Sequence, residues 1–82
     1  MSEPYRKVIR AIRRRMFENG MNIRMTAEAL GTHQVTLGRY LNLRVSMPAE
    51  LLIKAICYFD IDLCAVLWIV RHEEKTYEVY NP

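Results

Sequence analysis

Apolar residues recur at three- and four-residue steps in five segments of the chain, and this spacing predicts five short helices. The first segment follows Ser2, the predicted N-cap, has Pro4 in its first turn and ends at Asn19-Gly20. The side chains that this spacing turns inward are Tyr5, Val8, Ile9, Ile12, Met16 and Phe17. The opposite side of the same helix is basic and carries Arg6, Lys7, Arg10, Arg13 and Arg14.

The next two segments have the pattern of two short helices joined by one sharp turn. Asn22 is the predicted cap of the first of them, and Gly31 ends it because glycine readily adopts the positive φ that such a turn requires. Ala27 lies where the two helices would cross, and a larger side chain there would push them apart. Leu37 and Tyr40 point the second of these helices back at the same core.

The outward face of that second helix carries polar and small side chains. The helix begins at Thr32 or His33, and its predicted outward positions are His33, Gln34, Val35, Gly38, Arg39 and Asn42. Amide, guanidinium and imidazole groups suit the base edges in a major groove. The pattern is therefore typical of a DNA-reading helix-turn-helix.

The fourth and fifth predicted helices are the most apolar part of the chain. The fourth begins at Pro48, ends at Asp60 and turns inward Leu51, Leu52, Ala55, Ile56 and Phe59. Asp62 is the predicted cap of the fifth helix, which is apolar on nearly all sides over residues 63–70. Since a helix on a small monomer needs only one apolar stripe, we expect a second partner for this helix.

That partner is either a symmetry-related copy of the helix or the C-terminal tail, in which residues 76–80 alternate like a short strand. The second alternative gives a monomer. We favour a two-fold homodimer, with an interface formed by Trp68, Ile69, Tyr77 and Val79. The expected organisation is an all-α domain over residues 1–71 and a tail, containing the short strand, over residues 72–82.

The 82-residue chain has a net charge of +3, and this charge is unevenly distributed. Residues 1–45 contain nine Lys and Arg against three acids, whereas residues 46–82 contain three bases against six acids. Such a division indicates one electropositive face for a polyanion, although arginines that merely keep a helix solvated would give the same count.

Candidate chemistry other than anion binding is sparse. Cys57 and Cys64 match no metal or disulfide signature, so we expect free, mostly buried thiols in a reducing cytoplasm. His33 and His72 have no further ligand at metal-binding spacing, and no catalytic constellation is present, so we expect no metal, no cofactor and no enzyme activity.

The longest apolar run, the eight residues 63–70, is too short to span a bilayer, which takes roughly eighteen residues. We expect Tyr5, Tyr58, Met16, Met21 and Met25 to fill the core.

Residues 5–70 resemble the lambda-repressor-like, or Cro/Xre, family of DNA-binding domains. The family's structural positions are occupied by Ala27, Leu30, Gly31, Leu37 and Tyr40, and a second match runs from Pro48 through Leu51 and Ala55 to Phe59 and Leu63. The chain departs from the family at Ile23, at Thr32 and at Leu43, where a glycine often follows the third helix. The resemblance implies five helices, with the helix-turn-helix at the second and third.

Carried over by position, the resemblance implies two sets of DNA contacts. The base-contacting residues are His33, Gln34, Val35, Gly38 and Arg39, of which Gln34 is the first candidate because an amide can bond adenine N6 and N7 together. The phosphate-contacting residues are Asn22, Arg24, Thr36, Asn42 and Arg44. Gly38 inside a helix costs roughly 1 kcal/mol of stability relative to alanine. Either backbone or bases approach the helix closely at this glycine, or the glycine lowers stability without making any contact.

These features predict a cytoplasmic, repressor-like regulator of transcription, of bacterial, phage or mobile-element type, that binds a palindromic operator in double-stranded DNA. Two alternatives stay open. One is an antitoxin or antirepressor-like adaptor that mainly binds a protein. The other is an architectural or recombination factor, which would bend DNA with modest sequence preference.

Overall fold

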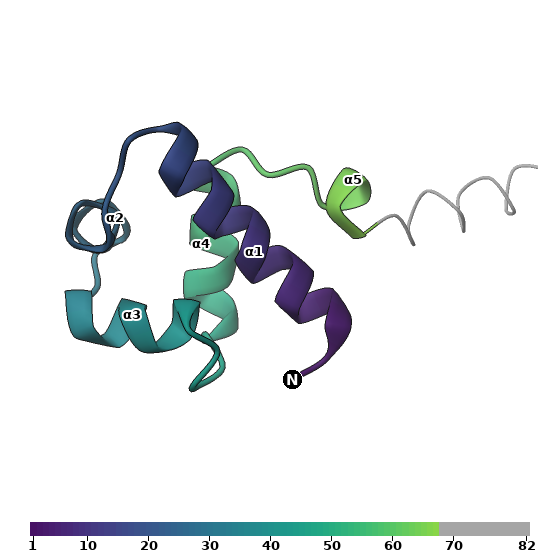
Figure 1. Ribbon diagram of the computed structural model, residues 1–82, viewed down its shortest axis with the longest axis horizontal. Coiled ribbons are helices and arrows are strands. Elements are labelled where there is room, and N and C mark those ends of the chain that lie inside the picture. The colour runs from purple at the N-terminus through teal and green to yellow at the C-terminus, as the bar shows by residue number, and fades with distance from the viewer. Residues whose placement is uncertain (68–82) are drawn as a thin grey trace, which may run out of the picture.

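The computed structural model describes residues 1–67, and in this part of the chain all regular structure is helical. The predicted all-α class is confirmed. The helices are α1 (Glu3–Glu18), α2 (Ile23–Leu30), α3 (Gln34–Leu41), α4 (Ala49–Tyr58) and α5 (Leu63–Leu67), as Figure 1 shows. The predicted strand over residues 76–80 and the predicted interface residues lie outside the described residues, the latter being Trp68, Ile69, Tyr77 and Val79.

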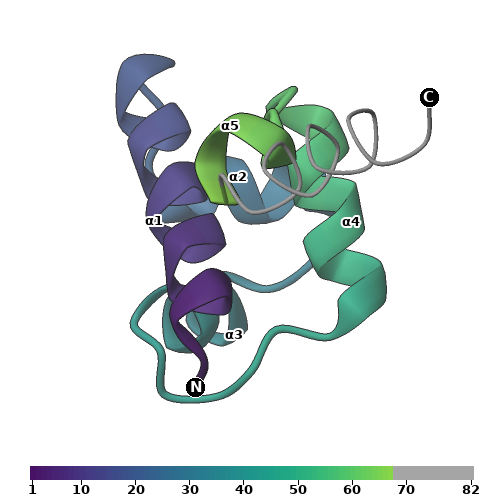
Figure 2. The ribbon, with the colours of Figure 1, turned by 90° about the vertical axis from the view of Figure 1, so that its right-hand side faces the viewer.

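The helices surround one core to which α1 contributes most. Figure 1 shows α2 end-on and α3 lengthwise, so the two are nearly perpendicular, and Figure 2 shows α5 beside α1. The buried apolar side chains are Val8, Ile9, Ile12, Met16, Ala27, Leu30, Leu37, Leu41, Met47, Ala55, Phe59 and Ile61. The three- and four-residue spacing identified most of this set. It did not identify Leu41, which is buried beside the partly buried Tyr40, nor Met47 and Ile61, which lie in connecting segments without helical periodicity.

Three predicted N-caps are confirmed by hydrogen bonds. The backbone N–H of Tyr5 donates to Ser2 Oγ (3.4 Å), that of Met25 to Asn22 Oδ1 (2.8 Å) and that of Ala65 to Asp62 Oδ1 (3.3 Å). Each bond satisfies a backbone donor that has no partner inside its helix. His33 precedes α3 in the N-cap position, but its side chain makes no capping bond.

All four longer helices end in the same way, with a residue of positive φ. These residues are Gly20 (64°), Gly31 (72°), Leu43 (61°) and Asp60 (51°). In each case the N–H of this residue donates to the carbonyl three residues back, and the next N–H donates to the carbonyl five residues before itself. This pair of bonds is the Schellman motif, which satisfies the last carbonyls and turns the chain sharply.

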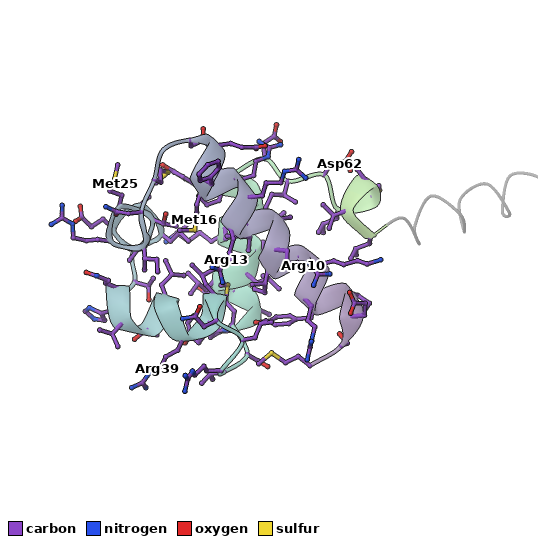
Figure 3. The ribbon with its side chains drawn as sticks, viewed as in Figure 1. Arg10, Arg13, Met16, Met25, Arg39 and Asp62 are labelled. Carbon is purple, nitrogen blue, oxygen red and sulfur yellow. The ribbon has the colours of Figure 1, made fainter. Side chains whose placement is uncertain are left out.

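Three side chains predicted to fill the core are exposed instead. Phe17 is 85% exposed because it follows Met16 by one residue, and a rotation of about 100° carries it off the buried face. Met25 and Tyr58 also point outward, from α2 and α4, with about half of their surface exposed. Met25 is labelled in Figure 3.

The prediction of buried thiols was wrong for Cys57. Both cysteines are free, but Cys57 is exposed on α4 and Cys64 is half-buried. Ile53, one turn before Cys57, is exposed as well, so both residues lie on the solvent side of α4. The residues predicted to turn inward in this segment are confirmed: Ala55 and Phe59 are buried, and Leu51, Leu52 and Ile56 pack against the core.

Tyr5 links α1 to the segment between α3 and α4. Its hydroxyl oxygen accepts a 2.8 Å hydrogen bond from the backbone N–H of Met47, whose side chain is buried. A backbone donor beside the core has few other acceptors, so this bond fixes the path of the chain into α4.

Tyr5→Phe should lower the free energy of unfolding by about 1–2 kcal/mol, because it leaves the Met47 N–H without its acceptor. Tyr58→Phe is the matched control, since it removes the same atom from an exposed ring and should change stability by less than about 0.5 kcal/mol. Urea unfolding of both variants measures the difference. Equal losses in the two variants would contradict a structural role for the Tyr5 hydroxyl.

Candidate nucleic-acid interface

The three residues between α2 and α3 hold the two helices at a fixed angle. Gly31 adopts the left-handed conformation, and the N–H of Thr32 donates to the Ala27 carbonyl at 2.9 Å. Ala27 is 1% exposed, so the contact between the helices leaves no room for a larger side chain. The predicted roles of Gly31 as the turn residue and Ala27 at the contact are confirmed.

One side of α3 is buried and the other faces solvent. Leu37 and Leu41 enter the core, and Tyr40 is half-buried beside them. Val35 is 69% exposed, and Arg39 projects from α3 away from the other helices in Figure 3. The exposed residues predicted to contact bases are His33, Gln34, Val35 and Arg39.

Four of the predicted site residues lie around one open groove of about 830 Å³. Asn22 and Arg24 reach it from the start of α2, and Gln34 and Asn42 reach it from the two ends of α3. The wall opposite them comes from α1 and the segment after it, with Arg13, Met16, Phe17 and Met21. Val35 and Arg39 are not among the residues that line the groove; they lie on the outer face of α3.

The remaining predicted residues lie at the edges of this surface. Thr36 is half-buried on α3, and Arg44 is exposed just after the helix. Asn22 has two roles, because its amide oxygen caps α2 at 2.8 Å while its amide nitrogen remains a donor for a ligand.

Ion pairs occupy three arginines on α1 and also Arg24 on α2, whose Nε lies 4.0 Å from Glu28. Arg10 pairs with Glu3 at 2.8 Å, and this hydrogen bond lowers the pKa of the Glu3 carboxyl. Arg14 and Arg15 both approach Glu18, at 3.5 and 3.8 Å. Within residues 1–67, Arg39 and Arg44 form no ion pair with an acidic side chain, so their charge is available to an anion from outside the protein.

One contact at this site, made by Arg13, was not predicted from the sequence. This residue was predicted to lie on the basic side of α1, and it is exposed there. In addition, its Nη1 donates to the Leu41 carbonyl at 3.1 Å and to Asn42 Oδ1 at 3.4 Å, and so joins α1 to the end of α3. The partners are 28 and 29 residues apart in the chain, and no local pattern links residues over that distance.

The side chains on this surface provide hydrogen-bond donors and acceptors, fixed positive charge and one branched apolar group. Such a set can recognise planar polar edges and anions. Within the described residues there is no group of three or more His, Cys, Asp or Glu side chains that could hold a metal ion. In the same part of the chain, no helix combines the length and apolar character needed to cross a membrane.

Comparisons of the chain with protein-family models, curated proteins and solved structures found no match.

Gly38 lies on α3 with open space around it. No protein atom outside the neighbouring backbone comes within 4 Å of a Cβ built at this position. The close approach that was one interpretation of this glycine is therefore not made by the protein itself. The space is left for solvent or a ligand.

Gly38→Ala should raise the free energy of unfolding of the free protein by about 0.5–1 kcal/mol, because alanine favours the helix and meets no neighbour. Gly20→Ala is the matched control. It also has open space, but its φ of 64° strains any residue with a Cβ, so it should lower stability by about 1 kcal/mol. Urea unfolding of both variants decides, and a destabilised Gly38→Ala protein would contradict the open geometry.

Proposed function

We propose that this chain is a sequence-specific double-stranded DNA-binding regulator of the lambda-repressor-like class, with α3 entering the major groove. The observation that carries the proposal is the exposed face of α3. This face presents Gln34, Val35 and Arg39 outward, while Leu37 and Leu41 fix the helix on the core. A helix held in this way can place three side chains against base edges without reorganisation.

Each exposed side chain of α3 suits a different feature of the groove. The Gln34 amide suits the N6 and N7 atoms of adenine, and the Arg39 guanidinium suits O6 and N7 of guanine. The exposed methyl groups of Val35 suit the thymine methyl. In this orientation, Gly38 lets the bases come close to the helix backbone.

The groove beside α3 suits the sugar-phosphate backbone. Asn22 and Arg24 lie at the start of α2, where the unsatisfied N–H groups of a helix favour an anion. Asn42 and Arg44 supply a donor and a charge at the other end of α3, and Thr36 lies on its flank. Contacts of this kind fix the orientation of the protein on the duplex and carry no sequence information.

We further propose that the protein acts as a two-fold homodimer on a palindromic operator. One α3 helix offers too few base contacts for high specificity, and two copies about 34 Å apart would address successive turns of one face of the duplex. The proposed interface residues are Trp68, Ile69, Tyr77 and Val79, all beyond the described residues.

Selection from random duplexes at two salt concentrations tests the function. We expect a preferred inverted repeat whose half-sites are centred one helical turn, about 10 base pairs, apart. A preferred single half-site would argue against the dimer. Binding of all duplexes with equal affinity, decreasing steeply with salt, would overturn sequence-specific reading in favour of general attraction to a polyanion.

Gln34→Ala should weaken binding to the selected site by about 1–3 kcal/mol and leave binding to random duplex almost unchanged. Arg44→Ala is the contrasting variant, because loss of a phosphate contact should weaken binding to every duplex and reduce the salt dependence by about one unit. Arg14→Ala, at an arginine paired with Glu18 on α1, controls for the loss of one charge. Titrations at three salt concentrations separate these effects. An equal loss on both duplexes for Gln34→Ala would contradict its assignment to a base.

A further inference from the structure

Arg13 is the one basic side chain of α1 that reaches the end of α3. Its Nη1 lies 3.1 Å from the Leu41 carbonyl oxygen and 3.4 Å from Asn42 Oδ1. Figure 3 shows Arg13 on α1 close to the C-terminal part of α3. We infer that Arg13 is a positioning residue, which fixes the end of α3 and orients the Asn42 amide toward a backbone phosphate. This inference rests on the proposed function.

The bond to Leu41 fixes the end of the helix. Leu41 is the last residue of α3, and the last four carbonyls of a helix find no N–H donor inside the helix. A guanidinium placed there supplies a donor and a positive charge at the negative end of the helix dipole. Because the Leu41 side chain is buried, the bond ties the position of α3 to both the core and α1.

The bond to Asn42 sets the direction of its amide. A guanidinium has donors only, so the oxygen of the Asn42 amide must face Arg13 and the two N–H groups must face away from it. Asn42 is exposed and lines the groove beside α3. Its N–H groups are thus available to a phosphate oxygen, and Arg13 acts on that contact through Asn42.

A simpler role for Arg13 is an independent contact with a phosphate. The two roles make different predictions when Arg13 and Asn42 are changed together. Independent contacts weaken binding by factors that multiply, whereas residues that act as a unit do not. Arg6 is the matched control, because it lies seven residues before Arg13 on the same side of α1, is exposed and forms no bond with Asn42.

The first measurement uses the free protein. Arg13→Gln should make amide hydrogen exchange at Asn42 and Arg44 about 3- to 10-fold faster, because their N–H groups close the end of α3. Arg13→Lys should behave like Arg13→Gln, since lysine keeps the charge but not the planar fork, and Arg6→Gln should leave these rates unchanged. Unchanged exchange in Arg13→Gln would overturn the positioning role.

The second measurement is a double-mutant cycle on binding to the selected duplex. Arg13→Gln and Asn42→Ala should each weaken binding by about 3- to 10-fold. The double variant should bind more tightly than the product of the two losses predicts, because the part of the Arg13 effect that acts through Asn42 is already lost. In the control pair, Arg6→Gln and Asn42→Ala should act independently. The double variant should then weaken binding by the product of the two single factors, which equals the Asn42→Ala factor alone if Arg6→Gln has no effect. Multiplied losses for Arg13 and Asn42 would overturn the inference in favour of an independent phosphate contact. If the wild-type protein binds no duplex, the proposed function and the phosphate contact of Asn42 both fail, and hydrogen exchange alone decides whether Arg13 fixes the end of α3.

Discussion

Each of the four longer helices ends in a Schellman motif, with one residue in the left-handed conformation, and the arrangement of the helices depends on this constraint. We call this motif the left-handed closure of the helix. The chain changes direction within three to seven residues after α1, α2, α3 and α4, and a polar backbone beside a small core must find partners at every turn. The same pair of hydrogen bonds, to carbonyls three and five residues back, supplies those partners at Gly20, Gly31, Leu43 and Asp60. Helices of eight residues are marginal alone, so their positions come from these closures and from packing.

This constraint explains why α3 can present a whole face outward. The closure at Gly31 places α3 nearly perpendicular to α2, and the closure at Leu43 turns the chain away before another element can cover the exposed side (Figure 1). Contacts with the core come only from Leu37, Leu41 and the half-buried Tyr40. The orientation of α3 therefore depends strongly on its two ends. The Ala27 carbonyl accepts a bond just before the helix begins, and Arg13 donates to the last carbonyl of the helix.

The elements of the fold could be predicted from sequence because their signals are local. Caps such as Asn22 and stops such as Gly31 act within four residues of their own position, and apolar spacing identifies the buried side of α1. What the sequence did not reveal depends on distant contacts. The Arg13 bond to α3 and the burial of Met47 arise only when segments far apart in the chain meet. The exposed face of α3 was predictable because it is the complement of a short local pattern.

Leu43 shows how such a distant contact can override a local preference. In the proposed lambda-repressor-like class a glycine often follows the third helix at this position, and the φ of 61° is the conformation that glycine adopts without strain. For leucine this conformation costs about 1–2 kcal/mol. The side chain is half-buried against the core, however, and partial burial of a leucine contributes about 1 kcal/mol or more. The two effects nearly cancel, so leucine is tolerated where glycine would leave the core less covered. Asp60 has no such compensation from burial, and its short polar side chain tolerates the left-handed region better than most residues do.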